Sequence, residues 1–561
     1  MEFTKNQQNL TVEGRRIKAV FEGGCLLQLQ DKDTDRQLVD AHPDHAPLEL
    51  LKHDSTLHPI GTGDHSECEL RMLGDHVAHF WFSDWEADAC ICITCDDERD
   101  EIIVEPSLTA IQDGVAGVRW NMSGIVEETD LVAPFYQGTR LPVGDELLVG
   151  RDWVWPQKWE AGYVSFLQKD GTGFYCLTED KDFRPKTITT GTQEARRTCG
   201  FTSENDGPWE GKREAGGLSW RVGLFSDGWQ SPAVRYKDWL WNTYPLQKAA
   251  SSKPDWADSV TLALSWCPCR PKILTVLAQR HPPEKTLLHV PGWRANNYDQ
   301  NYPDYEPDKA GVTFIESARE MGFRVMPHFN FFAVDPSHAL YRELGPYHLR
   351  NTNTRRLLGW SWKEGQMLGN PQSPSQIQEH QNINAMAYIH PGLSKWRREL
   401  AERIGAIVKR FDLEAVFVDQ TLCTGNYLNA IVEGTSTTEG MWHLTRELAR
   451  IRSGLAIGGE GLNEISMQWQ TFAQAHLFDS HHDTIDRLDE VPCPVNDFLF
   501  GDLCRTIGYS ALSGKDANSR LRLQAHAKLN TLPTITVHSP EEISDPNPAI
   551  EIELERASYL G

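Results

Sequence analysis

Hydrophobic and polar residues alternate in short segments over the first part of the chain, from Asn9 to about residue 235. Such segments include LTVEG, VAHFWF, EIIVEP and LSWRVGLF, and they are separated by Gly, Asp and Asn. An alternation of period two between regularly spaced turn residues is typical of half-buried antiparallel strands. We therefore predict an all-β domain over residues 1–250, built as a large β-sandwich or supersandwich.

The pattern changes near residue 255, after a stretch containing Pro, Ser and Lys that we interpret as a connection between domains. Continuous apolar runs then alternate with longer segments, which is typical of parallel strands covered by helices. The runs predicted as strands are 260–266, 286–293, 324–330, 414–420, 455–461, 475–480 and 532–538, with one further strand somewhere in 493–512. We therefore predict that residues 251–561 form an α/β domain, a TIM-type (β/α)8 barrel.

Two of the intervening segments have a clear helical pattern. In residues 393–411, apolar side chains recur three or four positions apart, and in 437–452 a capping box pairs Ser436 with Glu439 ahead of an apolar stripe. Residues 331–390, after the third strand, are too long for a simple loop and helix. We predict that they form an insertion at the active-site end of the barrel.

Three carboxylates each end an apolar run, namely Asp419, Glu460 and Asp479. In a barrel the active site lies at the C-terminal ends of the strands. Neighbouring strands lie about 4.8 Å apart, so acids on strands four and five can approach the separation of about 5 to 5.5 Å that a retaining glycosidase needs. The sequence therefore predicts glycoside chemistry.

Asp419 is the predicted nucleophile, because Gln420 and Thr421 follow it and can hold it ionised by hydrogen bonding. Glu460 is the predicted acid/base, and Gly458 and Gly459 before it are expected to let the backbone approach a sugar. Asp479 is the alternative acid/base, or a ligand for substrate hydroxyl groups.

A high aromatic content, with 19 Trp, 14 Tyr and 21 Phe, supports a sugar substrate, because aromatic faces pack against pyranose rings. Aromatic and polar residues near the predicted strand ends are the candidates for substrate binding. They are Trp266, Trp293, Tyr298, His328, Asn330, Trp362, His390, Gln420, Asp479 and His482.

Charge and composition narrow the possible partners. Lys and Arg number 55 against 79 Asp and Glu, a net charge of −24, which disfavours nucleic acid and anionic membranes as partners. We find neither an apolar run long enough for a membrane-spanning helix nor a signal peptide, and therefore expect a cytoplasmic protein. An oligosaccharide or glycoside is the expected partner, no cofactor is expected, and the oligomeric state stays open.

Twelve cysteines are scattered along the chain without the spacing of a disulfide scaffold. The one cluster, ACICITC, contains Cys90, Cys92 and Cys95. Its alternation favours a strand, and no matching CxxC or HxxxH follows, so no metal site is predicted.

The segments VFVDQT, with Asp419, and IGGEGLNE, with Glu460 41 residues later, resemble retaining α-glycosidases of glycoside hydrolase families 101 and 129. WVWPQKWEAG resembles the sandwich part of uncharacterised glycosidase-like proteins of this group. The resemblance implies a sandwich before a barrel, an Asp nucleophile on strand four, a Glu acid/base on strand five, and an α-galactoside or α-N-acetylgalactosaminide substrate. Similarity to α-galactosidase-like enzymes, whose acid/base lies on strand six, would favour Asp479.

Two other functions stay open. A carbohydrate-binding protein that has lost catalysis would keep the same residues and bind sugar without hydrolysing it. A metal-dependent hydrolase would use His481, His482 and Asp483 with His328 or His538. It is disfavoured because adjacent histidines point apart and no HExxH is present.

Overall fold

The structure is a computed structural model that describes residues 1–63, 66–193, 196–361, 365–367, 374–383, 385–477, 487–488 and 490–560. The chain divides into two compact units. We call the first the N-terminal unit; it consists of Met1–Phe135, Thr139–Thr243 and Gly425–Leu428. The second, the barrel unit, consists of Tyr136–Gly138, Tyr244–Thr424 and Asn429–Gly561.

The N-terminal unit contains two antiparallel sheets. The first has eleven strands: β1 (Glu2–Asn6), β2 (Asn9–Glu13), β3 (Ile17–Glu22), β4 (Cys25–Asp31), β5 (Arg36–Asp40), β6 (Leu48–Lys52), β7 (Leu57–Ile60), β12 (Val115–Ile125), β15 (Arg151–Val154), β18 (Lys186–Gln193) and β19 (Arg196–Glu204). The second has ten: β8 (Glu67–Gly74), β9 (Val77–Ser83), β10 (Ala87–Asp96), β11 (Glu101–Ala110), β13 (Asp130–Ala133), β14 (Thr139–Pro142), β16 (Tyr163–Leu167), β17 (Gly173–Leu177), β20 (Glu214–Gly216) and β21 (Trp220–Phe225). The predicted antiparallel β-structure is confirmed.

Aromatic rings from both sheets pack against one another in the interior of this unit. Phe201 on β19 lies 5.1 Å, centroid to centroid, from Trp220 on β21. Phe21 on β3 lies 6.4 Å from Phe80 on β9. All four rings are at most 1% exposed. The alternation seen in the sequence thus places one side of each strand in a core shared by the two sheets.

The barrel unit contains one parallel sheet of eight strands, in the order β34-β33-β32-β29-β24-β23-β22-β35. Their bounds are β22 (Leu262–Leu264), β23 (Thr286–Val290), β24 (Arg324–Asn330), β29 (Ala415–Asp419), β32 (Ala456–Glu460), β33 (Phe472–Ala475), β34 (Arg505–Gly508) and β35 (Thr534–Ile535). Between the two ends of this order, the backbone N–H of Leu532 donates to the carbonyl of Thr506 over 2.9 Å. The barrel is therefore nearly closed.

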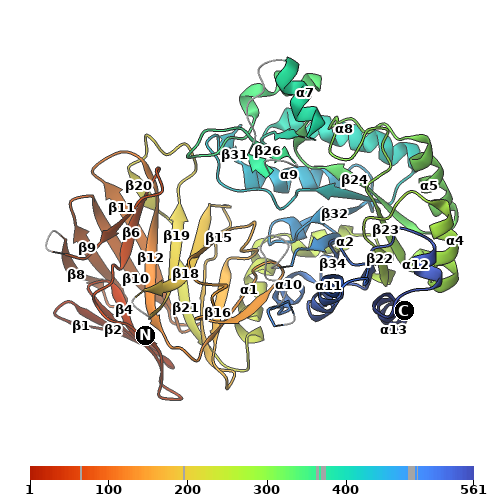
Figure 1. The fold of residues 1–561 in the computed structure, drawn as a ribbon. Helices are drawn as coiled ribbons and strands as arrows, with labels where there is room; N and C mark the ends of the chain where they lie inside the picture. Colours follow the sequence, from red (N-terminus) through yellow and green to blue (C-terminus); the bar gives the residue numbers. More distant parts are fainter. Residues whose placement is uncertain are drawn as a thin grey trace. The chain divides into compact units, whose positions relative to one another are not determined.

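Helices cover the outside of these strands (Figure 1). They are α2 (Leu246–Ser252), α3 (Trp256–Ser259), α4 (Pro271–Arg280), α5 (Lys309–Glu320), α8 (Ser394–Phe411), α9 (Thr437–Ala449), α10 (Val495–Phe500), α11 (Ala517–Lys528), α12 (Glu541–Ser544) and α13 (Pro548–Leu560). A cluster of buried side chains from the strands fills the core, among them Leu287, Met326, Phe417, Phe472 and Ile507. The interior is thus packed protein, as in other barrels of this type.

The two predicted helices are confirmed as α8 and α9, and the Ser436 hydroxyl accepts a hydrogen bond from the Glu439 N–H. The stretch interpreted as a connection is largely helical, because α1 (Gln230–Thr243) is followed by α2 and α3. The sixth strand was placed wrongly at 475–480, since β33 ends at Ala475. Leu477 instead packs in a separate cluster with Leu488, Ala525 and Leu529.

The segment after β24 carries a small sheet of its own, in the order β25-β28-β26-β27. Its described elements are β25 (Ala333–Val334), α6 (Ala339–Glu343), β26 (Leu358–Ser361), β27 (Gly365–Met367), α7 (Pro374–Asn382) and β28 (Met386–Tyr388). A short hairpin of β30 (Ile431–Val432) and β31 (Thr435–Ser436) precedes α9. The long segment is therefore a structured insertion at the C-terminal end of its barrel strand.

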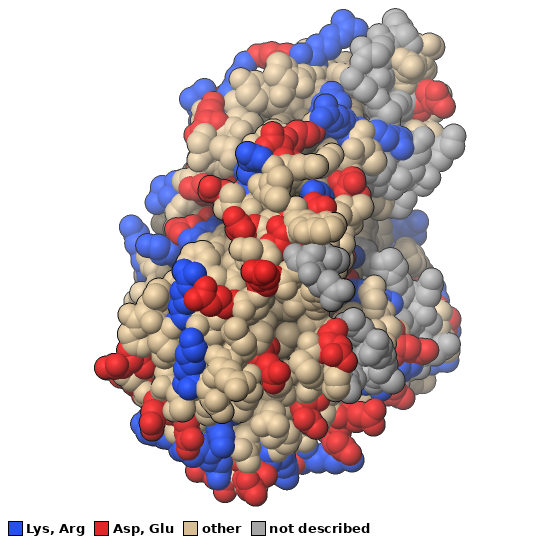
Figure 2. All heavy atoms as spheres, turned by 90° about the vertical axis from the view of Figure 1, so that its left-hand side faces the viewer, with Lys and Arg blue, Asp and Glu red and all other residues tan. Residues whose placement is uncertain are grey.

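Basic and acidic side chains are interspersed over the face that Figure 2 shows. Among the described residues, no helix has both the length and the apolarity needed to span a bilayer.

Candidate active site

Asp419 and Glu460 lie side by side at the C-terminal ends of two adjacent strands. β29 and β32 pair in parallel with Val418 opposite Gly459, so the acids that follow these residues occupy neighbouring positions. Their exposed fractions are only 7% and 8%, so both carboxyl groups are nearly removed from solvent.

The surroundings of Glu460 raise its pKa. Burial raises the pKa of Glu460 well above its usual range, and the charge of Asp419 and the hydrogen bond to it raise it further. The backbone N–H of Gln420, which donates to Glu460 Oε2 over 3.0 Å, acts in the opposite direction but does not outweigh burial. The surroundings of Glu460 therefore favour its neutral, protonated form beside Asp419.

His476 and Tyr509 also contact Glu460. His476 Nε2 lies 3.2 Å from Glu460 Oε1, and the Tyr509 hydroxyl forms a hydrogen bond with the same carboxyl group. Burial lowers the pKa of His476 to about 4, so its imidazole is neutral at pH 7 and forms no ion pair with Glu460. Burial, followed by the two acids, raises the pKa of Tyr509. Both neighbours thus hold Glu460 without adding a charge that would remove its proton.

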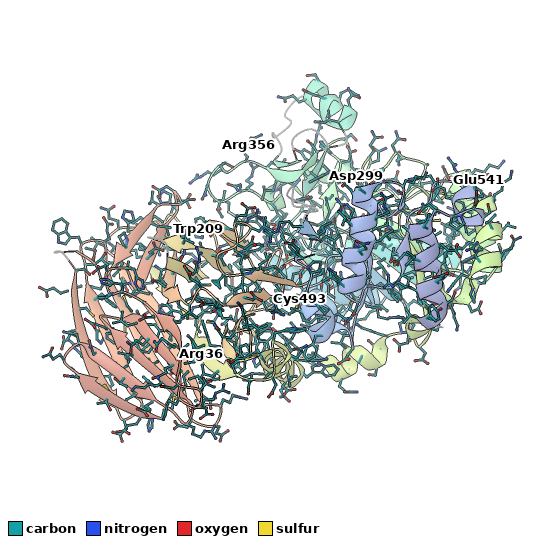
Figure 3. All side chains as sticks on the ribbon, turned by 60° about the horizontal axis from the view of Figure 1, so that its bottom comes forward. Arg36, Trp209, Asp299, Arg356, Cys493 and Glu541 are labelled. Carbon is teal, nitrogen blue, oxygen red and sulfur yellow. The ribbon has the colours of Figure 1, made fainter. Side chains whose placement is uncertain are left out.

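Asp419 is contacted by Tyr298 and His328. The Tyr298 hydroxyl donates to Asp419 Oδ2 over 3.4 Å, and His328 Nε2 lies 3.5 Å from the same oxygen. Burial, together with Asp419, raises the pKa of Tyr298 well above its usual range, so this hydroxyl stays a donor. Tyr298 lies in the loop after β23, next to Asp299, which is labelled in Figure 3. Arg294 donates to three backbone carbonyls of this loop, those of Asn297, Gln300 and Asp304.

A chain of hydrogen bonds determines which nitrogen of His328 carries its proton. The backbone N–H of Trp266 donates to His289 Nδ1 over 3.3 Å, so this nitrogen is an acceptor. Burial lowers the pKa of His289 well below its usual range, and a neutral His289 must then hold its proton on Nε2. That nitrogen lies 3.1 Å from His328 Nδ1 and donates to it. His328 is left with its own proton on Nε2, facing Asp419.

Three half-buried aromatic side chains, Trp266, Tyr298 and Tyr509, lie next to these acids. Trp266 and Tyr298 meet edge to face with centroids 5.5 Å apart, and Trp266 Nε1 donates to the Tyr509 carbonyl over 3.1 Å. The Tyr509 ring lies 4.2 Å from that of His476. Partly exposed rings beside a carboxyl pair suit the apolar face of a sugar.

Three of the predicted binding residues are buried and make hydrogen bonds at the ends of β24 and β29. Trp293 is fully buried and donates from Nε1 to the His328 carbonyl over 2.9 Å. Asn330, 1% exposed, donates to the Gln420 side-chain oxygen over 3.1 Å. Gln420 has a φ of +62°, which turns its N–H toward Glu460. These three side chains therefore shape the ends of β24 and β29.

His390 is fully buried away from the acid pair. Its Nδ1 accepts from the Gly392 N–H, and its Nε2 lies 2.9 Å from the Ala430 carbonyl. Burial lowers its pKa to about 4. Trp362, Asp479 and His482, with the neighbouring His481 and Asp483, lie outside the described residues. The choice of Asp479 as an acid/base therefore stays a prediction.

Protein side chains, rather than open space for a sugar, lie against the glycine before Glu460. A Cβ at Gly459 would collide with the Gln470 side-chain amide, which donates to the Thr421 hydroxyl over 3.0 Å. That hydroxyl in turn donates to the Glu460 carbonyl over 2.8 Å. These side chains occupy the space and hold the Glu460 backbone in place. The expectation that a sugar approaches this backbone is therefore wrong.

Sequence reasoning missed His289, His476 and Tyr509. His289 stands in the middle of the apolar run TLLHV, and a polar residue inside a fully buried strand was the available signal. His476 follows β33 and Tyr509 follows β34 directly. Sequence reasoning misplaced β33 and left the position of β34 open, so the residues that follow these two strands were not identified.

The chain matches the model of a domain of unknown function, DUF6259, over residues 218–433, a range that includes Asp419 but not Glu460. It is 26% identical over 129 residues, 22% of its length, to a candidate glycoside hydrolase from Bacteroides thetaiotaomicron. The match spans 19% of that protein.

Several solved structures are similar over the whole chain. The ligand-free α-N-acetylgalactosaminidase NagBb from Bifidobacterium bifidum has a TM-score of 0.65 at 11% identity, covering 100% of this chain and 92% of NagBb. The galactosidase domain of AgaSK, an α-galactosidase-sucrose kinase, has a TM-score of 0.51 at 11% identity, with 100% and 86% covered. The family GH36 α-galactosidase AgaB from Geobacillus stearothermophilus has 0.50 at 9%, with the same coverage.

The chain therefore has the fold of glycoside hydrolases that combine a β-sandwich with a TIM barrel. This agrees with the resemblance to α-glycosidases at the level of fold and does not single out family 129.

Proposed function

We propose that this chain is a retaining glycoside hydrolase that cleaves α-linked galactosides or N-acetylgalactosaminides. The observation that carries the proposal is the placement of two nearly buried carboxyl groups, Asp419 and Glu460, side by side at the ends of adjacent barrel strands. The substrate class is supported by the similarity in fold to NagBb and AgaB, which are named as an α-N-acetylgalactosaminidase and an α-galactosidase.

In the first step, the Asp419 carboxylate attacks the anomeric carbon while Glu460 transfers its proton to the glycosidic oxygen. The bond between that oxygen and the anomeric carbon breaks, the leaving alcohol departs, and a β-linked ester to Asp419 remains. In the second step, the Glu460 carboxylate takes a proton from a water molecule whose oxygen attacks the anomeric carbon. The ester bond breaks, the α-configured sugar is released, and both carboxyl groups return to their starting states.

The spacing of the acids favours retention over inversion. Inverting enzymes need about 6.5 to 9.5 Å between their carboxyl groups to admit a water molecule. The two acids follow paired positions on adjacent strands, which lie about 4.8 Å apart, and this spacing favours the separation of about 5 to 5.5 Å in retaining enzymes. The Tyr298 and His328 contacts hold the Asp419 carboxyl group in place beside Glu460.

The direct test is the configuration of the first sugar released. We expect hydrolysis of an aryl α-N-acetylgalactosaminide or α-galactoside, with the α-anomer seen first by proton NMR before mutarotation. The β-anomer appearing first would contradict the double displacement. Tight binding of these sugars without hydrolysis over long incubation would support a silent carbohydrate-binding protein instead.

We predict that two substitutions of His289 have different effects on this activity. In His289→Asn, the amide oxygen can replace Nδ1 as the acceptor for the Trp266 N–H, but the donor to His328 is lost. His328 can then carry its proton on Nδ1 and turn a lone pair toward Asp419. The N–H that faces Asp419 is then replaced by a lone pair, and we expect kcat to fall about tenfold, which corresponds to about 1.4 kcal/mol in the activation free energy.

His289→Gln is the matched variant, because its longer amide can still donate toward His328 Nδ1. We expect it to retain most of the wild-type kcat while KM changes little in either variant. Thermal unfolding of both proteins checks that the buried substitution is tolerated. Equal kcat values for two folded variants would rule out the proposed control of the His328 tautomer.

A further inference from the structure

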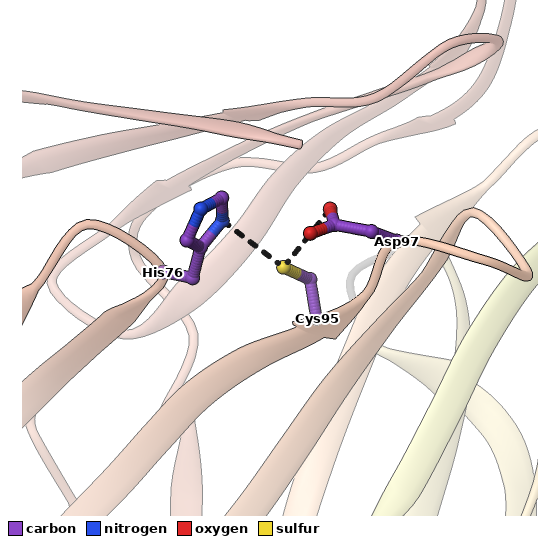
Figure 4. A group of neighbouring side chains, drawn as sticks. All are labelled: His76, Cys95 and Asp97. Carbon is purple, nitrogen blue, oxygen red and sulfur yellow. Dashed lines mark hydrogen bonds between the residues drawn. The ribbon is translucent and has the colours of Figure 1, made fainter.

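The N-terminal unit brings an imidazole, a thiol and a carboxylate together at one end of neighbouring strands of its ten-stranded sheet. His76 lies in the turn between β8 and β9, Cys95 near the end of β10, and Asp97 in the turn to β11 (Figure 4). The register of β9 and β10, with Ile93 opposite Ala78, continues to place Cys95 opposite His76. The topology of the sheet, rather than closeness in sequence, thus joins an imidazole to the Cys95 thiol.

Period-two alternation separates Cys95 from the other cysteines of the ACICITC segment. Cys90 and Cys92 are an even number of positions apart and share one side of β10, whereas Cys95 belongs to the side of Ile91 and Ile93. A site built from the three cysteines is therefore impossible within this strand. The partners of Cys95 come from the neighbouring turns.

The spacing of the three groups is that of a metal ligand set. Cys95 Sγ lies 3.6 Å from His76 Nδ1 and 3.7 Å from Asp97 Oδ1, and all three ligand atoms lie within 4.8 Å of one another. In a tetrahedral zinc site, bond lengths of about 2.3 Å to sulfur and about 2.0 to 2.1 Å to nitrogen give sulfur-to-nitrogen edges of about 3.6 Å. The two measured edges match this value.

We propose that His76, Cys95 and Asp97 form a binding site for a divalent cation of the zinc class. Thiolate and imidazole ligands select such ions over magnesium and calcium, which prefer all-oxygen sites. Three protein ligands leave a fourth tetrahedral position for water. This site is independent of the proposed glycosidase activity, because all its residues belong to the N-terminal unit.

The test uses the full-length chain after removal of metal with a chelator. Zn²⁺ is titrated in competition with a chromophoric chelator, and Co²⁺ serves as a spectroscopic probe. We expect one Zn²⁺ to be lost from the binding stoichiometry, or its affinity to fall at least about tenfold, in each of Cys95→Ser, His76→Gln and Asp97→Asn. The thiolate-to-cobalt absorption of the wild-type protein should disappear in Cys95→Ser.

Cys92→Ser is the matched control, because Cys92 lies on the opposite side of the same strand. It should leave both the Zn²⁺ affinity and the cobalt spectrum unchanged, and far-UV circular dichroism verifies that the variants are folded. Zn²⁺ binding that is unaffected by Cys95→Ser, or equally weakened by Cys92→Ser, would overturn the proposal. Failure of the wild-type chain to bind Zn²⁺ at micromolar concentrations would do so as well.

Discussion

Replacing Asp419 with alanine is expected to lower kcat on aryl α-glycosides about a thousandfold or more. The substitution removes the proposed nucleophile, and a nucleophile cannot be replaced by its neighbours when the reaction depends on one covalent intermediate. The fold should tolerate the change, because alanine removes a buried charge and leaves its partners Tyr298 and His328 with each other. Initial rates with a 4-nitrophenyl α-glycoside measure the effect.

Azide gives this variant a second, more specific readout. A small anion can enter the space left by the carboxylate and attack the anomeric carbon itself, so the expected product is the glycosyl azide of inverted, β configuration. Glu414→Gln is a matched control, since Glu414 immediately precedes the same strand at its opposite end and pairs with Arg324. Turnover by Asp419→Ala within tenfold of the wild-type rate would eliminate Asp419 as the nucleophile.

Replacing Glu460 with glutamine is expected to lower kcat by about 10²- to 10⁴-fold on substrates whose leaving alcohol needs a proton. Glutamine keeps the size of the side chain and an oxygen that can accept from the Gln420 N–H, but it has no carboxyl proton to transfer. The loss should shrink for substrates with an acidic phenol as leaving group, because those depart without protonation. A series of aryl glycosides with different phenols measures this dependence.

The same variant should change the pH dependence of the reaction. In the proposed mechanism Glu460 acts as an acid, so wild-type activity should be lost as the pH rises through its pKa, which burial and Asp419 raise well above the usual value. The alkaline limb of the wild-type profile should therefore lie above the range of an ordinary carboxyl group. In Glu460→Gln this limb should be absent, and azide should restore turnover with retained α configuration. An unchanged alkaline limb would assign the acid to another residue, of which Asp479 is the first candidate.

The helices and most barrel strands could be predicted from local pattern. A continuous apolar run such as AVFVD is buried on both sides in a parallel sheet, and β29 ends at the acid that ends the run. The stripe in α8 likewise buries Trp396, Leu400 and Ile404. The predicted position of the sixth strand was wrong for a physical reason. Apolar residues continue beyond Ala475, but Leu477 lies outside the sheet and packs with Ala525 of α11.

The contents of the site were less predictable than its position. Asp419 and Glu460 could be proposed because each directly follows apolar residues, and parallel neighbouring strands bring such ends together. Trp293 and His390 match the expected residue types, yet both are fully buried, which residue type alone does not reveal. Tyr509 could not be assigned without knowing where β34 ends.

The sequence by itself determined the two kinds of unit and the two acids at the strand ends, because periodicity records which side of each element is buried. Only the tertiary structure decided that Glu460 is buried beside Asp419, that His289 contacts His328, and that Cys95 meets His76. Each of these depends on burial and on distances between groups far apart in the chain, and neither quantity is encoded in the local order of residues.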